Sequence, residues 1–402
     1  MRAGTLALLA AVVLSGCQEK LTAPSDCPAL CPGGSPQVFD EIVSPIPGSD
    51  SSFSGYVQPQ AAPGLLVSNG LLGFEERAIL RFPSRADSVV VRDTARTYTI
   101  DSVALAFVLL ARDTTLTGLR LQVYRLPVAI DSTTTYAGVD PAFVPESLIT
   151  TVDLPDTLKS GTIRTVLSGP DLARVQIAPA DSGELALGLR LDAATPTGVR
   201  LGGAASGTGG AFITYATLDV PDTGTARLRT FGLSATFNSS LKPVVSVLDS
   251  TLLYVGGEPS SRALLRFELP PHIRDSATIV RATLELTPTT PIVGLPTDPA
   301  RLQARGVLAD LGAKSPVNSA AGRVPADTIE TGATSVNLEA VSVVQLWLGA
   351  TPLPSALVLA MAPDLEAASF SRPVFYSTRA ADPAVRPRLH ISYLRAFPFE
   401  NP

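Results

Sequence analysis

The sequence predicts an all-β protein made of two tandem jelly-roll-like β-sandwich domains, each with one short helix. Three observations predict this class. Apolar and polar residues alternate with a period of two in many short segments, as in strands with one buried face. The 31 glycines and 35 prolines interrupt the 402-residue chain too often for long helices. Similar segments also recur in the same order at a spacing of about 180 residues.

The amino terminus has the parts of an export signal. Arg2 supplies a positive charge, an apolar stretch covers 6–14, and Leu14-Ser15-Gly16-Cys17 ends it. The apolar stretch is too short for a transmembrane helix. The last four residues resemble the lipobox of bacterial lipoproteins, which implies a lipoprotein signal peptide over 1–16. The alternative is an ordinary secretory leader with an unrelated cysteine.

The lipobox resemblance also implies a membrane partner. Cys17 would be acylated and would anchor the chain in the lipid membrane. Gln18 stands where an aspartate would mark retention in the inner membrane. We therefore expect a lipid-anchored protein of the bacterial outer membrane or cell surface.

Residues 17–36 are predicted to form a tether, because they are rich in proline, serine, glycine and charge. Within this tether Cys27 and Cys31 make an even pair, which in an exported protein indicates a disulfide. Two unpaired thiols are the alternative. Metal or redox chemistry is not expected, because no histidine lies nearby and the spacing is C-x3-C rather than C-x-x-C.

Five segments of the two halves match in chain order, which indicates an internal duplication. The pairs are 77–82 with 262–267, 100–105 with 279–284, 120–122 with 301–303, 184–189 with 355–359, and 212–215 with 390–393. A turn around Pro221 lies between the two copies. We therefore expect one β-sandwich domain over 37–225 and a second over 226–402.

Strand alternation also predicts which side chains face the core. Leu80, Phe82, Leu265 and Phe267 should face inward, and the arginines between them, such as Arg266, should face outward. The nine-residue apolar run over 103–111 is typical of a strand that is covered on both faces.

Between the third and fourth matches, each copy has one short helical pattern, over 170–175 and over 339–348. Trp347, the single tryptophan, lies on the apolar side of the second pattern, so core packing is favoured over a sugar-stacking role. The glycine-rich stretch 198–210 leads into a strand and lacks a phosphate-binding signature. It is predicted to be a flexible hairpin loop.

The second copy resembles the DNRLRE-type, disaggregatase-related domain. The resemblance covers roughly 240–395. It rests on 252–256, 262–267, 282–286, Trp347-Leu348-Gly349, 375–379 and Arg386-Pro387-Arg388-Leu389. The first copy lacks the Trp-x-Gly and Arg-Pro-x-Leu motifs, and the hexapeptide that names the family is absent from both copies. The resemblance implies jelly-roll domains of exported or surface proteins, some of which bind glycans, and it carries over no catalytic residue.

Composition and charge narrow the function. A net charge of −5 and a pI near 5.2 argue against nucleic acid as a partner. His272 and His390, the only histidines, stand in no catalytic motif. Calcium would suit the loop aspartates, but no EF-hand or nonapeptide pattern is present. We expect no cofactor, and structural Ca²⁺ is kept as an alternative.

Five acidic residues are candidates for a glycosidase pair, which needs carboxyl groups about 5–10 Å apart. They are Glu75, Glu76, Glu258, Asp364 and Glu366. Sequence alone gives no distance between them, and solvated loop carboxylates are the ordinary interpretation. Three tyrosines in predicted loops, Tyr56, Tyr98 and Tyr136, are candidates for contact with a glycan chain.

Three functional classes remain. The favoured one is a non-catalytic surface binding and display module for a polysaccharide or a surface protein. The second is a purely structural envelope lipoprotein, and the third is a polysaccharide hydrolase or lyase. The favoured class predicts no enzyme activity and no catalytic residues, and it leaves the ligand-binding residues unknown.

Overall fold

The computed structural model describes residues 37–395, apart from 87, 92, 176–182, 219–226, 244–248, 259, 319–325, 350 and 352. The predicted signal peptide, the tether, the lipidation site at Cys17 and the disulfide between Cys27 and Cys31 lie outside the described residues. Within the described ranges, no helix is both long enough and apolar enough to cross a membrane.

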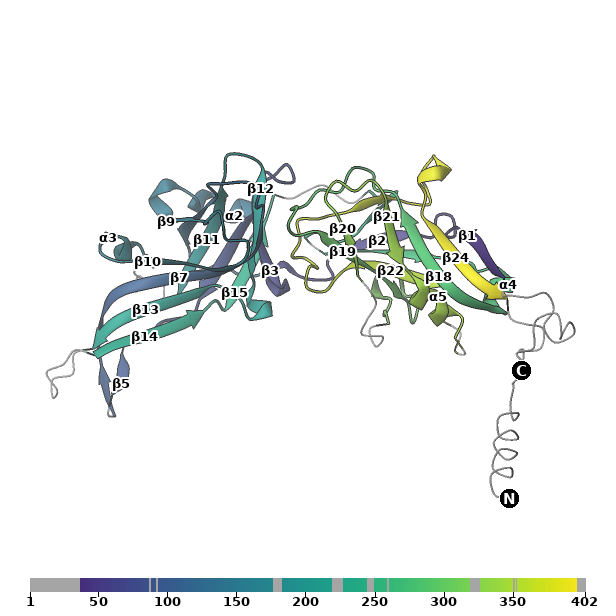
Figure 1. Ribbon diagram of the computed structural model, residues 1–402. Helices are drawn as coiled ribbons and strands as arrows, with labels where there is room; N and C mark the ends of the chain where they lie inside the picture. The colour runs from purple at the N-terminus through teal and green to yellow at the C-terminus, as the bar shows by residue number, and fades with distance from the viewer. Residues whose placement is uncertain are drawn as a thin grey trace, which may run out of the picture.

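The predicted all-β class is confirmed. Antiparallel strands are the main regular structure of the described residues, and they are packed as face-to-face sheets in two lobes (Figure 1). We call residues 64–241 the first lobe, and residues 38–54 together with 252–395 the second lobe. Each lobe encloses its own large apolar cluster.

The first lobe contains two main sheets. One has the order β14 (Arg227–Ser234), β13 (Ala211–Leu218), β7 (Tyr98–Arg112), β12 (Thr197–Gly202) and β3 (Gly64–Asn69), with β10 (Gly161–Leu167) also paired to β7. The other has the order β15 (Phe237–Leu241), β4 (Arg77–Phe82), β11 (Leu185–Asp192), β8 (Arg120–Leu126) and β9 (Leu148–Asp153). A small ribbon joins β5 (Val89–Val91) to β6 (Thr94–Arg96).

The second lobe repeats this plan. One sheet has the order β1 (Val38–Val43), β24 (Arg388–Arg395), β18 (Ala277–Leu286) and β21 (Val336–Glu339). The other has the order β2 (Ser51–Ser54), β17 (Ser261–Arg266), β22 (Ala356–Met361), β19 (Ala300–Gly306) and β20 (Asp327–Ile329). A further pair joins β16 (Leu252–Tyr254) to β23 (Val374–Tyr376).

The strand orders of the two lobes coincide, as the sequence matches predict. In one sheet of each lobe, the successive strands β4, β11, β8 and β9 correspond to β17, β22, β19 and β20. In the other sheet β13, β7 and β10 correspond to β24, β18 and β21. The repeated sequence therefore builds a similar strand order twice, although β12 and β3 extend the sheet of β7 whereas β16 and β23 form a separate pair.

The edge strands, however, are exchanged between the two copies. β1 and β2 precede the first copy along the chain, yet they pair with β24 and β17 of the second lobe. β14 and β15 precede the second copy, yet they pair with β13 and β4 of the first lobe. Figure 1 shows purple β1 lying beside yellow β24. We refer to this arrangement as the strand exchange.

The strand exchange corrects the predicted domain boundaries. Strand pairing places 38–54 with the second lobe and 227–241 with the first, whereas we expected units of 37–225 and 226–402. Alternation along a strand reveals its buried face, but it does not reveal which distant edge completes its hydrogen bonds. The sequence repeats therefore predicted the positions of the two copies, but they did not predict that the edge strands are exchanged between them.

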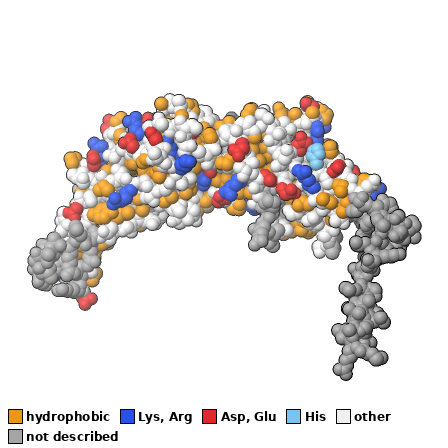
Figure 2. Space-filling view, in the orientation of Figure 1, with side chains coloured by type: hydrophobic (Ala, Val, Ile, Leu, Met, Phe, Trp, Pro, Cys, Tyr) orange, Lys and Arg blue, Asp and Glu red, His pale blue; other side chains and the backbone are white. Residues whose placement is uncertain are grey.

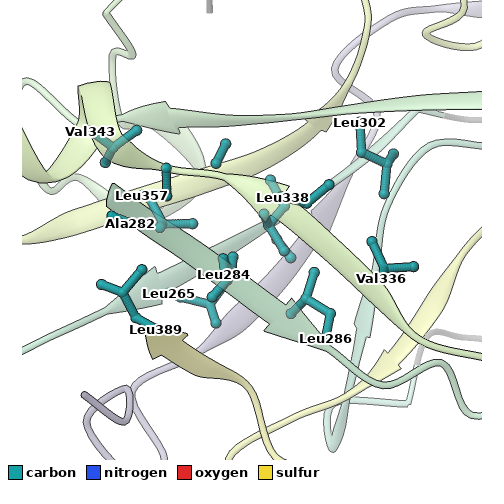
Figure 3. Packing of buried hydrophobic residues seen from close by; sticks show 14 of the residues in the cluster. Leu265, Ala282, Leu284, Leu286, Leu302, Val336, Leu338, Val343, Leu357 and Leu389 are labelled. Atoms are coloured by element: carbon teal, nitrogen blue, oxygen red, sulfur yellow. The ribbon is translucent and has the colours of Figure 1, made fainter. Parts of the chain in front are cut away.

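The predicted core positions are confirmed. Leu80, Phe82, Leu265 and Phe267 are all buried, and Figure 3 shows how the second-lobe cluster packs between its sheets. Trp347 is also buried, with its ring centroid 5.6 Å from that of Phe267. Its indole N–H donates to a backbone carbonyl, so both its apolar body and its polar edge are satisfied.

The short helical patterns both form helices, as α3 (Pro170–Arg174) and α5 (Val341–Trp347). The expectation of one helix per copy is too low, because α2 (Tyr136–Val139) and α4 (Pro271–Arg274) add a helical turn to each lobe. Single 3₁₀ turns are η2 (Pro59–Ala61), η3 (Asp140–Ala142), η4 (Pro145–Ser147), η6 (Ala204–Ser206), η8 (Gly312–Lys314) and η9 (Pro383–Val385).

The glycine-rich stretch differs from the predicted hairpin loop. Its first part lies within strand β12, and only the residues after Gly202 form a connection. β12 and β13 each pair with β7 rather than with one another, so this connection is not a hairpin. Its glycines allow close approach: a Cβ on Gly202 would stand 2.3 Å from the carbonyl oxygen of Thr208.

Candidate binding sites

The outer face of the sheet β1–β24–β18–β21 carries an open hollow of about 600 Å³, which we call the sheet-face hollow. In β24 the side chains of Leu389, Ile391 and Tyr393 enter the core, so His390 and Ser392 must point outward. Polar side chains from all four strands line it: Asp40, Arg281, Thr283, Glu285, Asn337, His390 and Ser392.

Several of these polar groups are held by one another across the strands. His390 Nε2 lies 2.9 Å from Glu285 Oε2, and the Ser392 hydroxyl donates to Asp40. The other histidine, His272, makes a similar contact of 2.7 Å with Glu41 at the β1 edge. Figure 2 shows histidine beside acidic and basic side chains on the second lobe. The hollow therefore offers fixed donors and acceptors on one solvent-facing surface.

The equivalent face of the first lobe is different. β18 pairs Leu284 with Leu389, and β7 pairs Leu105 with Phe212, so Phe212 corresponds to Leu389. His390 therefore corresponds to Ile213, which corrects the predicted match of 212–215 with 390–393 by one residue. A shift of one residue exchanges the two faces of a strand. By the same register Glu285 corresponds to Ala106, so the charges of the hollow are particular to the second lobe.

The three candidate tyrosines do not form a shared platform. The ring of Tyr98 packs 5.2 Å from that of Phe231. The guanidinium of Arg262 lies 4.3 Å from the Tyr56 ring, and that of Arg77 lies 4.7 Å from the Tyr136 ring. Each tyrosine is therefore engaged by its own neighbours. None of the three lines the sheet-face hollow.

Three of the five candidate carboxylates are neutralised by arginines. The ion pairs are Glu75 with Arg77 and Arg190, Glu366 with Arg262, and Asp364 with Arg301. The remaining two, Glu76 and Glu258, come from opposite lobes and meet in a cavity between them. We call this space of about 240 Å³ the junction cavity.

Local backbone structure fixes both glutamates of the junction cavity. Glu76 forms an isolated bridge with Ser68, with N···O distances of 2.8 and 3.2 Å, just before β4 begins. Glu258 follows Gly257, whose φ of +72° is in the left-handed region, in the turn between β16 and β17. The two residues are only 1% and 5% exposed. Lys242, which follows β15, donates to the backbone carbonyl of Glu258.

Burial controls the charges in the junction cavity. Desolvation raises the pKa of Glu258 well above its ordinary value, and the nearby charge of Glu76 raises it further. Desolvation also raises the pKa of Glu76, although Lys242 and the hydrogen bond with Glu258 act in the opposite direction. A hydrogen bond between two carboxyl groups requires a proton, which the pair shares. Burial lowers the pKa of Lys242.

This arrangement differs from that of a glycosidase pair. Retaining and inverting glycosidases separate their carboxyl groups by about 5 Å or more, whereas those of Glu76 and Glu258 are close enough to share a hydrogen bond. Among the described residues, no group of three or more His, Cys, Asp or Glu side chains could hold a metal ion. The cavity is suited to binding small polar groups.

Comparison with protein-family models finds no match for this chain, and comparison with curated proteins finds none either. The resemblance of the second copy to the DNRLRE-type domain therefore stays a prediction from its motifs.

Sequence reasoning singled out Glu76 and Glu258 but missed Lys242 and Arg372, which line the same cavity. In the sequence, Glu76 lies 166 residues before Lys242, and Arg372 lies 114 residues after Glu258. Only the packing of the two lobes brings them together.

Proposed function

We propose that this protein is an exported, lipid-anchored surface lipoprotein that binds a polysaccharide without turning it over. The sheet-face hollow is the observation that carries the proposal. Its side chains present both donors and acceptors on four strands, and each sugar hydroxyl can both donate and accept a hydrogen bond. The sheet-face hollow is also open to solvent, so a polymer can lie across it.

The position of the hollow fits an anchored binding protein. The predicted tether over 17–36 leads directly into β1, and β1 forms one edge of the hollow. Lipidation of Cys17 would therefore hold the binding surface close to its membrane attachment. The acidic chain has no electrostatic attraction of its own to an anionic surface, so acyl chains would supply the anchoring.

The chemistry of the hollow supports binding more than turnover. His390 is paired with Glu285. Among the residues that line the hollow, Ser392 is the only serine and there is no cysteine. The Ser392 hydroxyl donates to Asp40 rather than to His390. Nucleophilic catalysis needs the hydroxyl to donate to the base instead. We therefore assign these side chains to hydrogen bonding with the ligand.

A glycan array probed with the full chain in detergent tests the proposal. We expect Asn337→Ala and His390→Ala to weaken binding about tenfold each, because each loses a hydrogen bond in a shared site. The matched control is Ile213→Ala, because Ile213 of the first lobe corresponds to His390 of the second. Product release that one of these changes abolishes would favour a hydrolase or lyase. Absence of both binding and turnover would favour a structural envelope lipoprotein.

A further inference from the structure

Three polar atoms in the junction cavity are buried without a partner. Among the described residues, nothing forms a hydrogen bond with Glu76 Oε1, Glu258 Oε2 or Arg372 Nε. All three residues line the cavity. Burying a polar group without a hydrogen bond costs about 1–3 kcal/mol, so three such atoms in one cavity indicate a site built for an occupant.

The unpaired atoms specify the chemistry of that occupant. The two carboxyl oxygens accept hydrogen bonds, so the ligand must present two donors. Arg372 donates, so the ligand must also present an acceptor. No carboxylate among the described residues forms an ion pair with Arg372, whose guanidinium lies 5.7 Å from the ring of Tyr254. A ligand carboxylate would supply that missing partner in a charge-assisted geometry.

The charge balance of the cavity points the same way. Lys242 and Arg372 contribute two positive charges. The two glutamates share one proton in their hydrogen bond, so together they contribute one negative charge. The cavity therefore has an excess of positive charge, which an anionic ligand would neutralise. Hydroxyl groups on the same ligand would donate hydrogen bonds to the two glutamates.

The walls and the volume limit the ligand to a small ring. Apolar side chains from both lobes surround the polar groups, among them Leu66 and Phe74 of the first lobe and Ile292 and Phe370 of the second. A volume of about 240 Å³ is several times the share of one water molecule in the liquid, about 30 Å³. Apolar walls with a few convergent polar groups are typical of small-molecule sites.

We propose that the junction cavity is a second ligand site, and that it binds a single hydroxylated carboxylate of the uronic-acid type. Arg372 would bind the carboxylate, and Glu76 and Glu258 would accept hydrogen bonds from ring hydroxyls. Because both lobes supply the walls, the ligand would also strengthen the contact between them. This site does not depend on the sheet-face hollow.

Calorimetry on the full chain in detergent tests the site with three probes. D-glucuronate carries hydroxyls and a carboxylate, D-glucose carries only the hydroxyls, and acetate carries only the carboxylate. We expect glucuronate to bind at least about tenfold more tightly than either of the others. Equal affinity for glucuronate and glucose would overturn the role of Arg372. No heat of binding with any probe would overturn the site.

Two variants separate ligand binding from folding. Arg372→Met should lower the affinity for glucuronate about tenfold or more while keeping the volume of the side chain. Val293 lines the cavity and is 45% exposed, so Val293→Phe should block entry without touching a polar group. Leu308→Phe, at a similarly exposed residue that does not line the cavity, is the control. Unchanged affinity in Val293→Phe would contradict the proposal.

The same measurement distinguishes this site from the proposed polysaccharide site. Asn337→Ala and His390→Ala should leave glucuronate affinity unchanged, because both residues lie in the sheet-face hollow. Loss of glucuronate binding in those variants would place the ligand in the hollow and overturn the cavity as a separate site.

Discussion

Phe370 of the second lobe packs directly onto Gly198 of β12 in the first lobe. A Cβ at position 198 would stand 2.6 Å from Cζ of the phenylalanine ring. Two residues further along the same face of β12, Arg200 forms a two-point ion pair with Asp298, with N···O distances of 2.8 and 2.7 Å. Leu66 and Leu295 complete an apolar cluster around Phe370. One face of β12 is therefore part of the contact surface between the lobes.

The close approach at Gly198 predicts that even a methyl group will disturb this contact. Gly198→Ala should lower the free energy of unfolding by about 1–3 kcal/mol, because the phenylalanine ring must move. Gly232→Ala is the matched control, since a Cβ on this strand glycine would have no neighbouring atom within 4 Å. Urea denaturation of both variants measures the difference. Equal midpoints would mean that the lobes do not depend on this contact.

The ion pair between Arg200 and Asp298 predicts a second effect on the junction. Their side chains are only 13% and 11% exposed, so Asp298→Ala would leave a buried guanidinium without its partner. We expect a loss of about 3–5 kcal/mol, with partial recovery in the double variant that also carries Arg200→Met. Thermal unfolding measures both. Asp275→Ala, in an exposed pair with Arg274, should cause no measurable change.

Local patterns predicted the faces of the strands well. Leu80, Phe82, Leu265 and Phe267 alternate with polar residues, and alternation requires only the two-residue period of an extended chain. Arg266 was expected on the outer side and does leave the core. It is nevertheless half-buried, because it forms an ion pair with Asp310 and donates to the backbone carbonyl of Ser49.

Long-range pairing could not be predicted in the same way. Ile42 of β1 pairs with His390 of β24, across almost the whole chain, and no local signal specifies that partner. The match of Phe212 with His390 failed by one residue for a related reason. The correct register of β13 against β24 depends on which residues of β7 and β18 lie opposite them. The meeting of Glu76 and Glu258 likewise follows from the packing of two lobes.

The strand exchange predicts that Asp50 stabilises the second lobe. Asp50 is fully buried between β1 and β2 and accepts bonds of 2.8 Å from the Thr378 amide and hydroxyl. It also forms an ion pair of 3.0 Å with Arg379. Asp50→Ala should cost about 3 kcal/mol or more, because it leaves these donors unpaired.

Hydrogen exchange locates the effect of Asp50→Ala. Amides of β17 and β24 should lose protection, whereas those of β4 and β13 should keep theirs, because strand pairing places Asp50 with the second lobe. The opposite pattern would restore the continuous unit over 37–225 that the sequence predicts.

The lipobox-like sequence predicts that acylation holds the protein at the membrane. Cys17→Ser should move the chain from the membrane pellet to the soluble fraction, because the acidic chain is not attracted electrostatically to an anionic lipid surface. Cell fractionation followed by immunoblotting measures this. Cys27→Ser removes a different cysteine of the predicted tether and is the control. Retention of Cys17→Ser in the pellet would require another mode of attachment.

The buried carboxyl pair predicts how stability changes with pH. The pKa of Glu258 is raised above its ordinary value of 4.5, mainly by burial, so the folded protein holds a proton that the unfolded chain releases. This contribution is fully present below pH 4.5 and is lost as the pH rises through the higher folded value. The urea midpoint of the unaltered protein should therefore fall as the pH rises above 4.5, and it should fall less in Glu258→Gln, because a neutral amide has no proton to release. Glu330→Gln, at an exposed carboxylate, should leave the decline unchanged. An identical pH profile in Glu258→Gln and the unaltered protein would show that the pair is ionised in the folded state.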